Sequence, residues 1–270
     1  VFVPVSSIIH TFHWDNGRKL YDSKTANLSY YDNVANISHK LTADSVSLMT
    51  LRNTLGLSLN EGFHPWMKFG LTAYAEHEYR RYGSISDVKL PLDSELDPFR
   101  QGHTHHENLL WIGGRLVSTQ DSILQFNADA KLCMLGDHIG NFDISGDVRS
   151  HFRLWKRLVS VSAEGFARNE TPDYFYRRFY SNHYAWNQEL KNMYRLRLQG
   201  NLHIPSWGTS LKAGVENISN YVYFNEKAQS TQYEGQLQVM YAQWKQALSY
   251  GVFHFDFNVV GQLSSRQEVL

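Results

Sequence analysis

Residues 141–154 read NFDISGDVRSHFRL, a stretch in which polar and apolar side chains alternate at nearly every position. One parity carries Asn, Asp, Ser, Asp, Arg, His and Arg, whereas the other carries Phe, Ile, Gly, Val, Ser, Phe and Leu. This period of two predicts a β-strand with two different faces. In a soluble protein the apolar face would cover the core. In a membrane barrel it would contact lipid, and the charges would face an aqueous lumen.

The same alternation recurs along almost the whole chain, for example over 67–80, 124–134 and 194–204. The alternating runs last about 10 to 14 residues, whereas globular strands average about 5 to 6. A tilted strand that crosses a bilayer needs about 9 to 11 residues. The run lengths therefore favour a membrane barrel over a soluble β-sandwich, which is the competing interpretation.

The connections between these runs sort by length. Short ones are expected at 61–66, 119–121, 154–156 and 205–208, and longer polar ones at 15–44, 83–106, 171–190 and 220–235, with a shorter link near 136–139. Because short and long connections alternate, all tight turns fall at one end of the sheet, as in outer-membrane barrels. Three tight turns carry Trp66, Trp155 and Trp207, which fits an aromatic girdle at a membrane interface.

Composition excludes several other classes of protein. The chain has 270 residues, zero formal net charge and one cysteine, Cys133, so an intrachain disulfide is excluded and nucleic acid is not an expected partner. No apolar run is long enough for a transmembrane helix, and no signal peptide is visible. The expected fold is an all-β, antiparallel up-and-down transmembrane β-barrel. We expect about 10 to 12 strands, with residues 1–270 forming one domain that is part of a larger barrel.

The polar parity supplies the candidate functional residues. We expect these charged side chains to line the lumen: Arg52, Lys68, Glu76, Glu78, Arg80, Asp129, Lys131, Asp143, Asp147, Arg149, Arg153, Glu164, Arg168, Arg195, Arg197, Lys212 and Glu216. Charges of both signs on facing strands can set the field across an aqueous pore. Alternatively, they pair with one another and simply fill the interior of a narrow barrel.

Sites for chemistry receive little support. His103, His105 and Glu107 form the densest cluster of ligand-type residues, but a solvated outer loop is the favoured interpretation over a metal site. The sequence contains no G-x-S-x-G nucleophile elbow and no glycine-rich phosphate loop. We therefore expect no enzymatic activity and no cofactor, and an outer-membrane hydrolase stays a minor alternative.

The stretch LKAGVENISNYVYFNEKAQSTQYEGQLQVMYAQWKQ at 211–246 resembles the Bacteroidetes "putative porin" family of outer-membrane β-barrels. In that family a V-E-N-x-x-N-Y-x-Y-F run ends a strand and enters an outer loop. PVSSIIHTFHWDNGRKLYDS at 4–23 is similar to an earlier strand and loop of the same family. Family members are longer, so the resemblance implies that this chain is a portion of one. Asn217, Asn220 and Tyr221 occupy motif positions, for which fixing the loop is favoured over binding substrate.

The resemblance implies an outer-membrane location and channel activity. We expect passive diffusion of small hydrophilic solutes, with outer-membrane lipid and these solutes as partners. One alternative is a non-conducting barrel that serves as a structural or assembly component among other envelope proteins, in a secretion or adhesion complex. A second alternative is a soluble β protein that binds an apolar ligand.

Overall fold

The computed structural model describes residues 6–23, 42–62, 68–86, 104–119, 123–181 and 184–266. Long antiparallel strands make up most of this part of the chain. They are β1 (Ser6–Ser23), β2 (Thr42–Leu59), β3 (Gly70–Ser86), β4 (Thr104–Ser118), β5 (Leu124–Gly136), β6 (Phe142–Leu154), β7 (Arg157–Glu170), β10 (Met193–Ile204), β11 (Thr209–Phe224), β12 (Ser230–Tyr250) and β13 (Phe253–Ser264).

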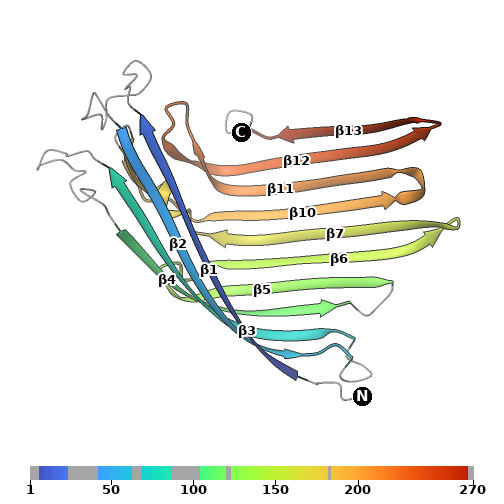
Figure 1. Cartoon of the computed structure of the whole chain (residues 1–270), viewed down its shortest axis with the longest axis horizontal. Coiled ribbons are helices and arrows are strands. Elements are labelled where there is room, and N and C mark those ends of the chain that lie inside the picture. The colour runs from blue at the N-terminus through green and yellow to red at the C-terminus, as the bar shows by residue number, and fades with distance from the viewer. Residues whose placement is uncertain are drawn as a thin grey trace, which may run out of the picture.

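These strands form one 11-stranded sheet in which each strand pairs with the next along the chain. The order is β1-β2-β3-β4-β5-β6-β7-β10-β11-β12-β13, the up-and-down topology expected from the alternation. Figure 1 shows a curved wall, with β1 to β4 running diagonally and β10 to β13 nearly horizontal. Over the described residues the wall is open, with β1 and β13 as its edges, so the structure is a partial barrel.

The strands extend further toward the long-loop end than the alternation indicated. They contain 12 to 21 residues. The expected long link 15–44 is shortened to 24–41, 83–106 to 87–103, and 220–235 to 225–229. The strands are longer than the alternating runs because backbone hydrogen bonds do not depend on which side chains are polar. Pairing between strands therefore continues beyond the residues that alternate. Among the described residues, no helix is long and apolar enough to cross a membrane.

Tight turns connect the strands at the opposite end, on the right of Figure 1. Trp155 and Lys156 join β6 to β7 with φ angles of 48° and 66°. Two residues with positive φ match a type I′ turn, whose twist suits a two-residue hairpin. Pro205–Trp207 form a short 3-10 helix between β10 and β11, and Gly208 ends it in the left-handed region. The tight turns predicted at 154–156 and 205–208 are confirmed, whereas the predicted long link 220–235 is reduced to residues 225–229.

The register gives the sheet two chemically different faces. Lys131, Asp143, Arg168 and Arg195 are paired in a single row across β5, β6, β7 and β10. We call the face that carries this row the inner face. Ile144 lies on the opposite, outer face, and 51% of its surface is exposed. Many other exposed Leu, Val and Phe side chains lie on the same outer face. A face this apolar and this exposed is the pattern of a wall that contacts lipid.

The connection between β7 and β10 has a structure of its own. It contains α1 (Tyr174–Arg177) and a small separate sheet of β8 (Arg178–Tyr180) and β9 (Ala185–Asn187). We call residues 171–192 the inner segment, because its side chains contact β3 and β4 across the inner face. The long connection predicted at 171–190 is present, but it packs on the inner face instead of forming a solvated polar link.

Candidate functional site: a charged chamber on the inner face

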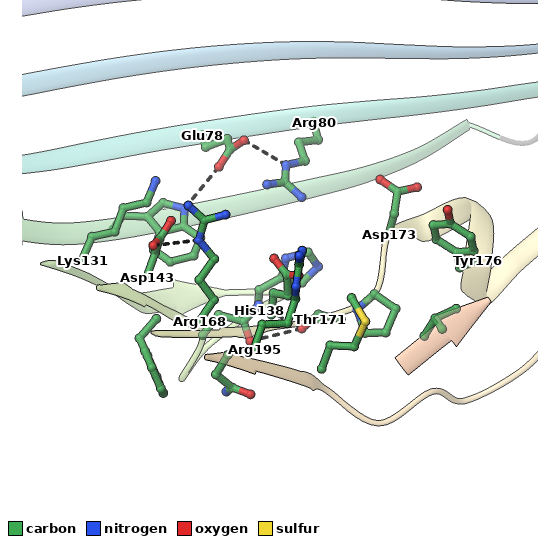
Figure 2. Close-up of a pocket in the computed structure, with 18 of the residues that line it drawn as sticks. Glu78, Arg80, Lys131, His138, Asp143, Arg168, Thr171, Asp173, Tyr176 and Arg195 are labelled. Carbon is green, nitrogen blue, oxygen red and sulfur yellow. Dashed lines mark hydrogen bonds and ion pairs between the residues drawn. The ribbon is translucent and has the colours of Figure 1, made fainter. Parts of the chain in front are cut away.

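A cavity of about 750 Å³ lies between the inner face of the sheet and the inner segment. We call it the chamber. Its wall combines β2 and β3 with β5, β6, β7 and β10, so the inner face is concave. Seven of the predicted lumen residues line it: Arg52, Glu78, Arg80, Lys131, Asp143, Arg168 and Arg195. Figure 2 shows Lys131, Asp143 and Arg168 at the left of the chamber and Asp173 and Tyr176, from the inner segment, at the right.

Ion pairs between strands, and one pair within β3, organise the chamber. Arg168 Nε lies 3.0 Å from Asp143 Oδ1, its cross-strand neighbour. Lys131 Nζ lies 3.2 Å from Glu76 Oε1, and Arg80 Nε lies 3.0 Å from Glu78 Oε1. These pairs hold the charged groups in fixed positions, because each is linked to a rigid strand at both ends.

Arg195 is held by two carboxylates. Its Nη2 lies 2.6 Å from Glu216 Oε1 on β11, and its Nη1 lies 3.7 Å from Glu170 Oε1 on β7. Arg197 also approaches Glu216, at 3.9 Å, and donates from Nε to the Tyr241 hydroxyl at 3.1 Å. The chamber wall is thus a network of opposite charges, in which structural pairing and exposure to the cavity coexist.

Other predicted lumen residues lie on the same face outside the chamber. Asp129 pairs with Arg115 at 3.0 Å, and Arg149 Nε lies 3.3 Å from Asp147. The remaining ones show no ion pair among the described residues: Lys68, Arg153, Glu164 and Lys212. Lys68 precedes β3, whereas the others occupy strand positions of the inner face. The register places Arg153, Glu164 and Lys212 on the inner face, and pore lining itself stays a prediction.

Glu107 on β4 fastens the inner segment. Its side chain is fully buried, at 0% exposure, and its Oε1 accepts a 2.7 Å hydrogen bond from Arg177 Nη2 on α1. His138 Nε2 lies 3.3 Å from the same oxygen, and Arg80 Nη1 lies 3.8 Å from Oε2. One carboxylate therefore joins α1 to β3, β4 and the turn between β5 and β6. We call this group the Glu107 clamp.

Aromatic packing supports the clamp. Tyr82 on β3 is 1% exposed and packs on Tyr174 at 4.9 Å and Phe175 at 5.5 Å between ring centroids. The His105 ring stacks on Tyr174 at 4.4 Å. Burial raises the pKa of Tyr174, the α1 residue at the centre of this cluster, so its hydroxyl stays neutral near pH 7. The inner segment thus has a small core of its own on the inner face.

Amides fix the two ends of the inner segment. Asn141 Nδ2 donates to Thr171 Oγ1 at 3.1 Å, and Asn192 Nδ2 donates to Asn141 Oδ1 at 3.0 Å. Asn220, a position of the V-E-N-x-x-N-Y run, has a φ of 58° at a bulge in β11. Its side chain donates to the Asn192 carbonyl at 2.9 Å. Asn220 therefore fixes the loop, which is the role favoured for it from the sequence.

The weaker sequence candidates have structural positions as well. His105 Nε2 lies 3.7 Å from Glu107 Oε1, but that oxygen is bound by Arg177. No group of three potential ligands occurs among the described residues, and His103 lies outside them. Trp155 and Trp207 sit at the tight-turn end, 80% and 46% exposed, whereas Trp66 lies outside the described residues. The aromatic girdle stays a prediction.

The sequence matches the model of a family described as "Putative porin", over residues 1–270. The chain belongs to this porin family. A comparison with curated proteins gives no match. The membership agrees with the resemblance carried by the 211–246 stretch and accounts for a sheet with one apolar and one charged face.

Two solved structures have a fold similar to that of the porin chain. It is similar to the copper transporter OprC with a TM-score of 0.61 and 12% identity, over 97% of this chain and 45% of that one. It is also similar to the siderophore receptor PirA from Pseudomonas aeruginosa, with a TM-score of 0.53 and 11% identity, over 95% and 48%. The porin chain thus spans about half the length of these structures. Family and fold together place it in the bacterial outer membrane.

Sequence reasoning missed the inner segment and its contacts with β4. On β4 the residues Leu109 and Trp111 face inward and are 1% and 7% exposed. The run LLWI at 109–112 is apolar on both parities, and a strand apolar on both faces must be covered on both. The stretch YFYRRFY at 174–180 contains five aromatic residues in seven, which suits a packed segment better than a solvated loop.

Proposed function

We propose that this porin-family protein is a passive diffusion channel for small hydrophilic solutes. The observation that carries the proposal is the chamber, a charged cavity of about 750 Å³ on the concave face of a wall whose outer face is apolar. Water and polar solutes are stabilised beside such a face, whereas lipid is stabilised beside the other.

The inner segment would set the size limit of the channel. It crosses the inner face from β7 and β10 to β3 and β4, and the Glu107 clamp holds it there. Solutes would pass between this segment and the paired charges of Lys131, Asp143 and Arg168. Because both signs occur there, we expect weak discrimination between simple cations and anions.

Conductance in planar lipid bilayers tests this proposal. We expect stepwise current increases in potassium chloride after insertion of the purified protein, and larger steps when residues 174–187 are replaced by a short Gly-Ser linker. A silent bilayer with correctly folded protein would contradict passive diffusion. Folding is checked by the β-sheet circular dichroism of the same sample.

The second candidate is a non-conducting barrel with a structural role among other envelope proteins. The fixed inner segment favours it, because a segment anchored by a buried ion pair and stacked rings can close a lumen. This candidate predicts no current from the wild type and current from the linker variant. We also propose that outer-membrane lipid covers the outer face, and that the protein carries out no chemical reaction of its own.

A further inference from the structure

We propose that the chamber binds the carboxylate group of a small hydrophilic solute, and that Arg52 is the residue that recognises it. The inference rests on the proposed function, because the solute would reach the chamber through the lumen.

Arg52 is the unusual charge of the chamber. It lies on the inner face of β2, where its cross-strand neighbour on β3 is Glu78. Its Nε atom is buried and has no hydrogen-bond partner in the part of the chain that the structure describes. The guanidinium also forms no ion pair among the described residues. A partly buried charge without a partner is costly, so a group of this kind favours a bound anion.

Glu78 does not neutralise Arg52, although it sits directly opposite. Its Oε1 accepts from Arg80 Nε at 3.0 Å, and its Oε2 accepts from the Trp111 indole at 3.2 Å. Both carboxylate oxygens are therefore engaged by groups on β3 and β4. This arrangement leaves the Arg52 guanidinium available to a ligand.

The remaining cations of the chamber are compensated. Lys131, Arg168 and Arg195 each have a carboxylate within 3.2 Å, on Glu76, Asp143 and Glu216 respectively. Asp173 is an acid of the chamber without an ion pair among the described residues. Its Oδ1, however, accepts the Phe175 N–H at 3.0 Å and caps α1. Arg52 is thus the cation of the chamber that has no carboxylate partner among the described residues, so it is the group at which an anion would bind.

A guanidinium matches a carboxylate better than it matches a spherical anion. Its N–H groups form a planar fork that can donate two parallel hydrogen bonds to the two carboxylate oxygens. The volume of the chamber, about 750 Å³, is within the usual range for small-molecule sites. Tyr176 also lines the chamber and can donate from its hydroxyl to a polar group on the same solute.

Isothermal titration of the detergent-solubilised protein with succinate tests the assignment. Loss of one charge-assisted, two-pronged contact should weaken succinate binding roughly tenfold or more in Arg52→Gln. Arg52→Lys should be intermediate, because it keeps the charge but not the fork. Lys212→Gln is the matched control: it removes a cation of the same face outside the chamber and should leave succinate affinity unchanged.

A gain of binding gives a second, independent readout. Glu78→Gln removes the carboxylate that pairs with Arg80 at 3.0 Å and lies opposite Arg52. Because a negative charge is lost beside both guanidinium groups, succinate should bind more tightly to this variant than to the wild type. Three results would each overturn the proposal. The wild type could give no binding heat with succinate, or the wild type and Arg52→Gln could bind succinate with equal affinity. Chloride could also compete for the site as well as a carboxylate does. Because titration does not require current flow, failure of the carboxylate site and failure of the channel function are distinguishable.

Discussion

Strands β4 and β6 belong to the same sheet and the same barrel wall, yet their inner faces differ completely. β6 carries Asp143, Asp147 and Arg149 inward and meets water or paired charges there. β4 carries Glu107 and Leu109 inward, where Glu107 is buried against Arg177 of the inner segment and Leu109 is buried in a cluster with Trp111 and Cys133. Strict alternation of polar and apolar residues therefore indicates a strand with one face exposed to water. A run that is apolar at every position indicates a strand that is covered on both faces.

The largest expected effect comes from removing the clamp on β4. Glu107→Ala leaves Arg177 and His138 facing a buried gap, which should lower the free energy of unfolding by about 3 to 5 kcal/mol. Denaturant unfolding of the refolded protein, followed by tryptophan fluorescence, measures it. Asp147→Ala on β6 is the matched change, because it also removes the carboxylate of an ion pair. Its partner Arg149 is 60% exposed, so the free energy of unfolding should fall by less than about 1 kcal/mol. Equal losses would remove the distinction between the two strands.

The two faces of β6 give the next test. Ile144→Arg on the outer face should cost roughly 2 to 4 kcal/mol near the bilayer midplane, because a charge would face lipid. Asp147→Arg on the inner face should change conductance or ion preference and have little effect on folding. Unfolding in lipid vesicles and single-channel recording measure the two outcomes. If the two variants behave alike, the assignment of faces is wrong.

The smallest expected effect concerns the end of the inner segment. Asn220→Ala should cost about 1 to 2 kcal/mol, because Ala is disfavoured at a φ of 58° and the hydrogen bond to Asn192 is lost. Asn220→Gly restores the backbone freedom, so the difference between the two variants isolates the conformational part. Limited proteolysis at Arg177 and Arg178 should become faster in both, since the hydrogen bond is absent from both. Unchanged proteolysis would mean that Asn220 does not hold the segment.

Most of the wall follows from local pattern. The parity read from 141–154 places Asp143 and Ile144 on opposite faces, and the register agrees. Topology was also accessible, because short and long connections alternate and fix the direction of successive strands. Side-chain period is a property of each strand alone, so a sequence without a structure can reveal it.

Only part of the chamber could be predicted from the sequence. Its strand residues were expected, but the pairing of Arg168 with Asp143, and the lack of a partner at Arg52, depend on register and curvature. The inward position of the inner segment could not be predicted, because it depends on the contact between Arg177 and Glu107, which lie 70 positions apart in the sequence. Contacts over such a separation leave no periodic signal, although the aromatic run from Tyr174 to Tyr180 was a compositional one.

The Glu107 clamp also imposes an order on assembly. Neighbouring strands pair through short connections and can zip together locally, whereas the contact from Arg177 to Glu107 closes a loop of 70 residues. We therefore expect the inner segment to dock after β3 to β7 have formed and curved. Until then, its aromatic side chains and the inner faces of β3 and β4 stay uncovered. On this expectation the ion pair between Glu107 and Arg177 forms late in folding, once the curved sheet has brought the two residues together.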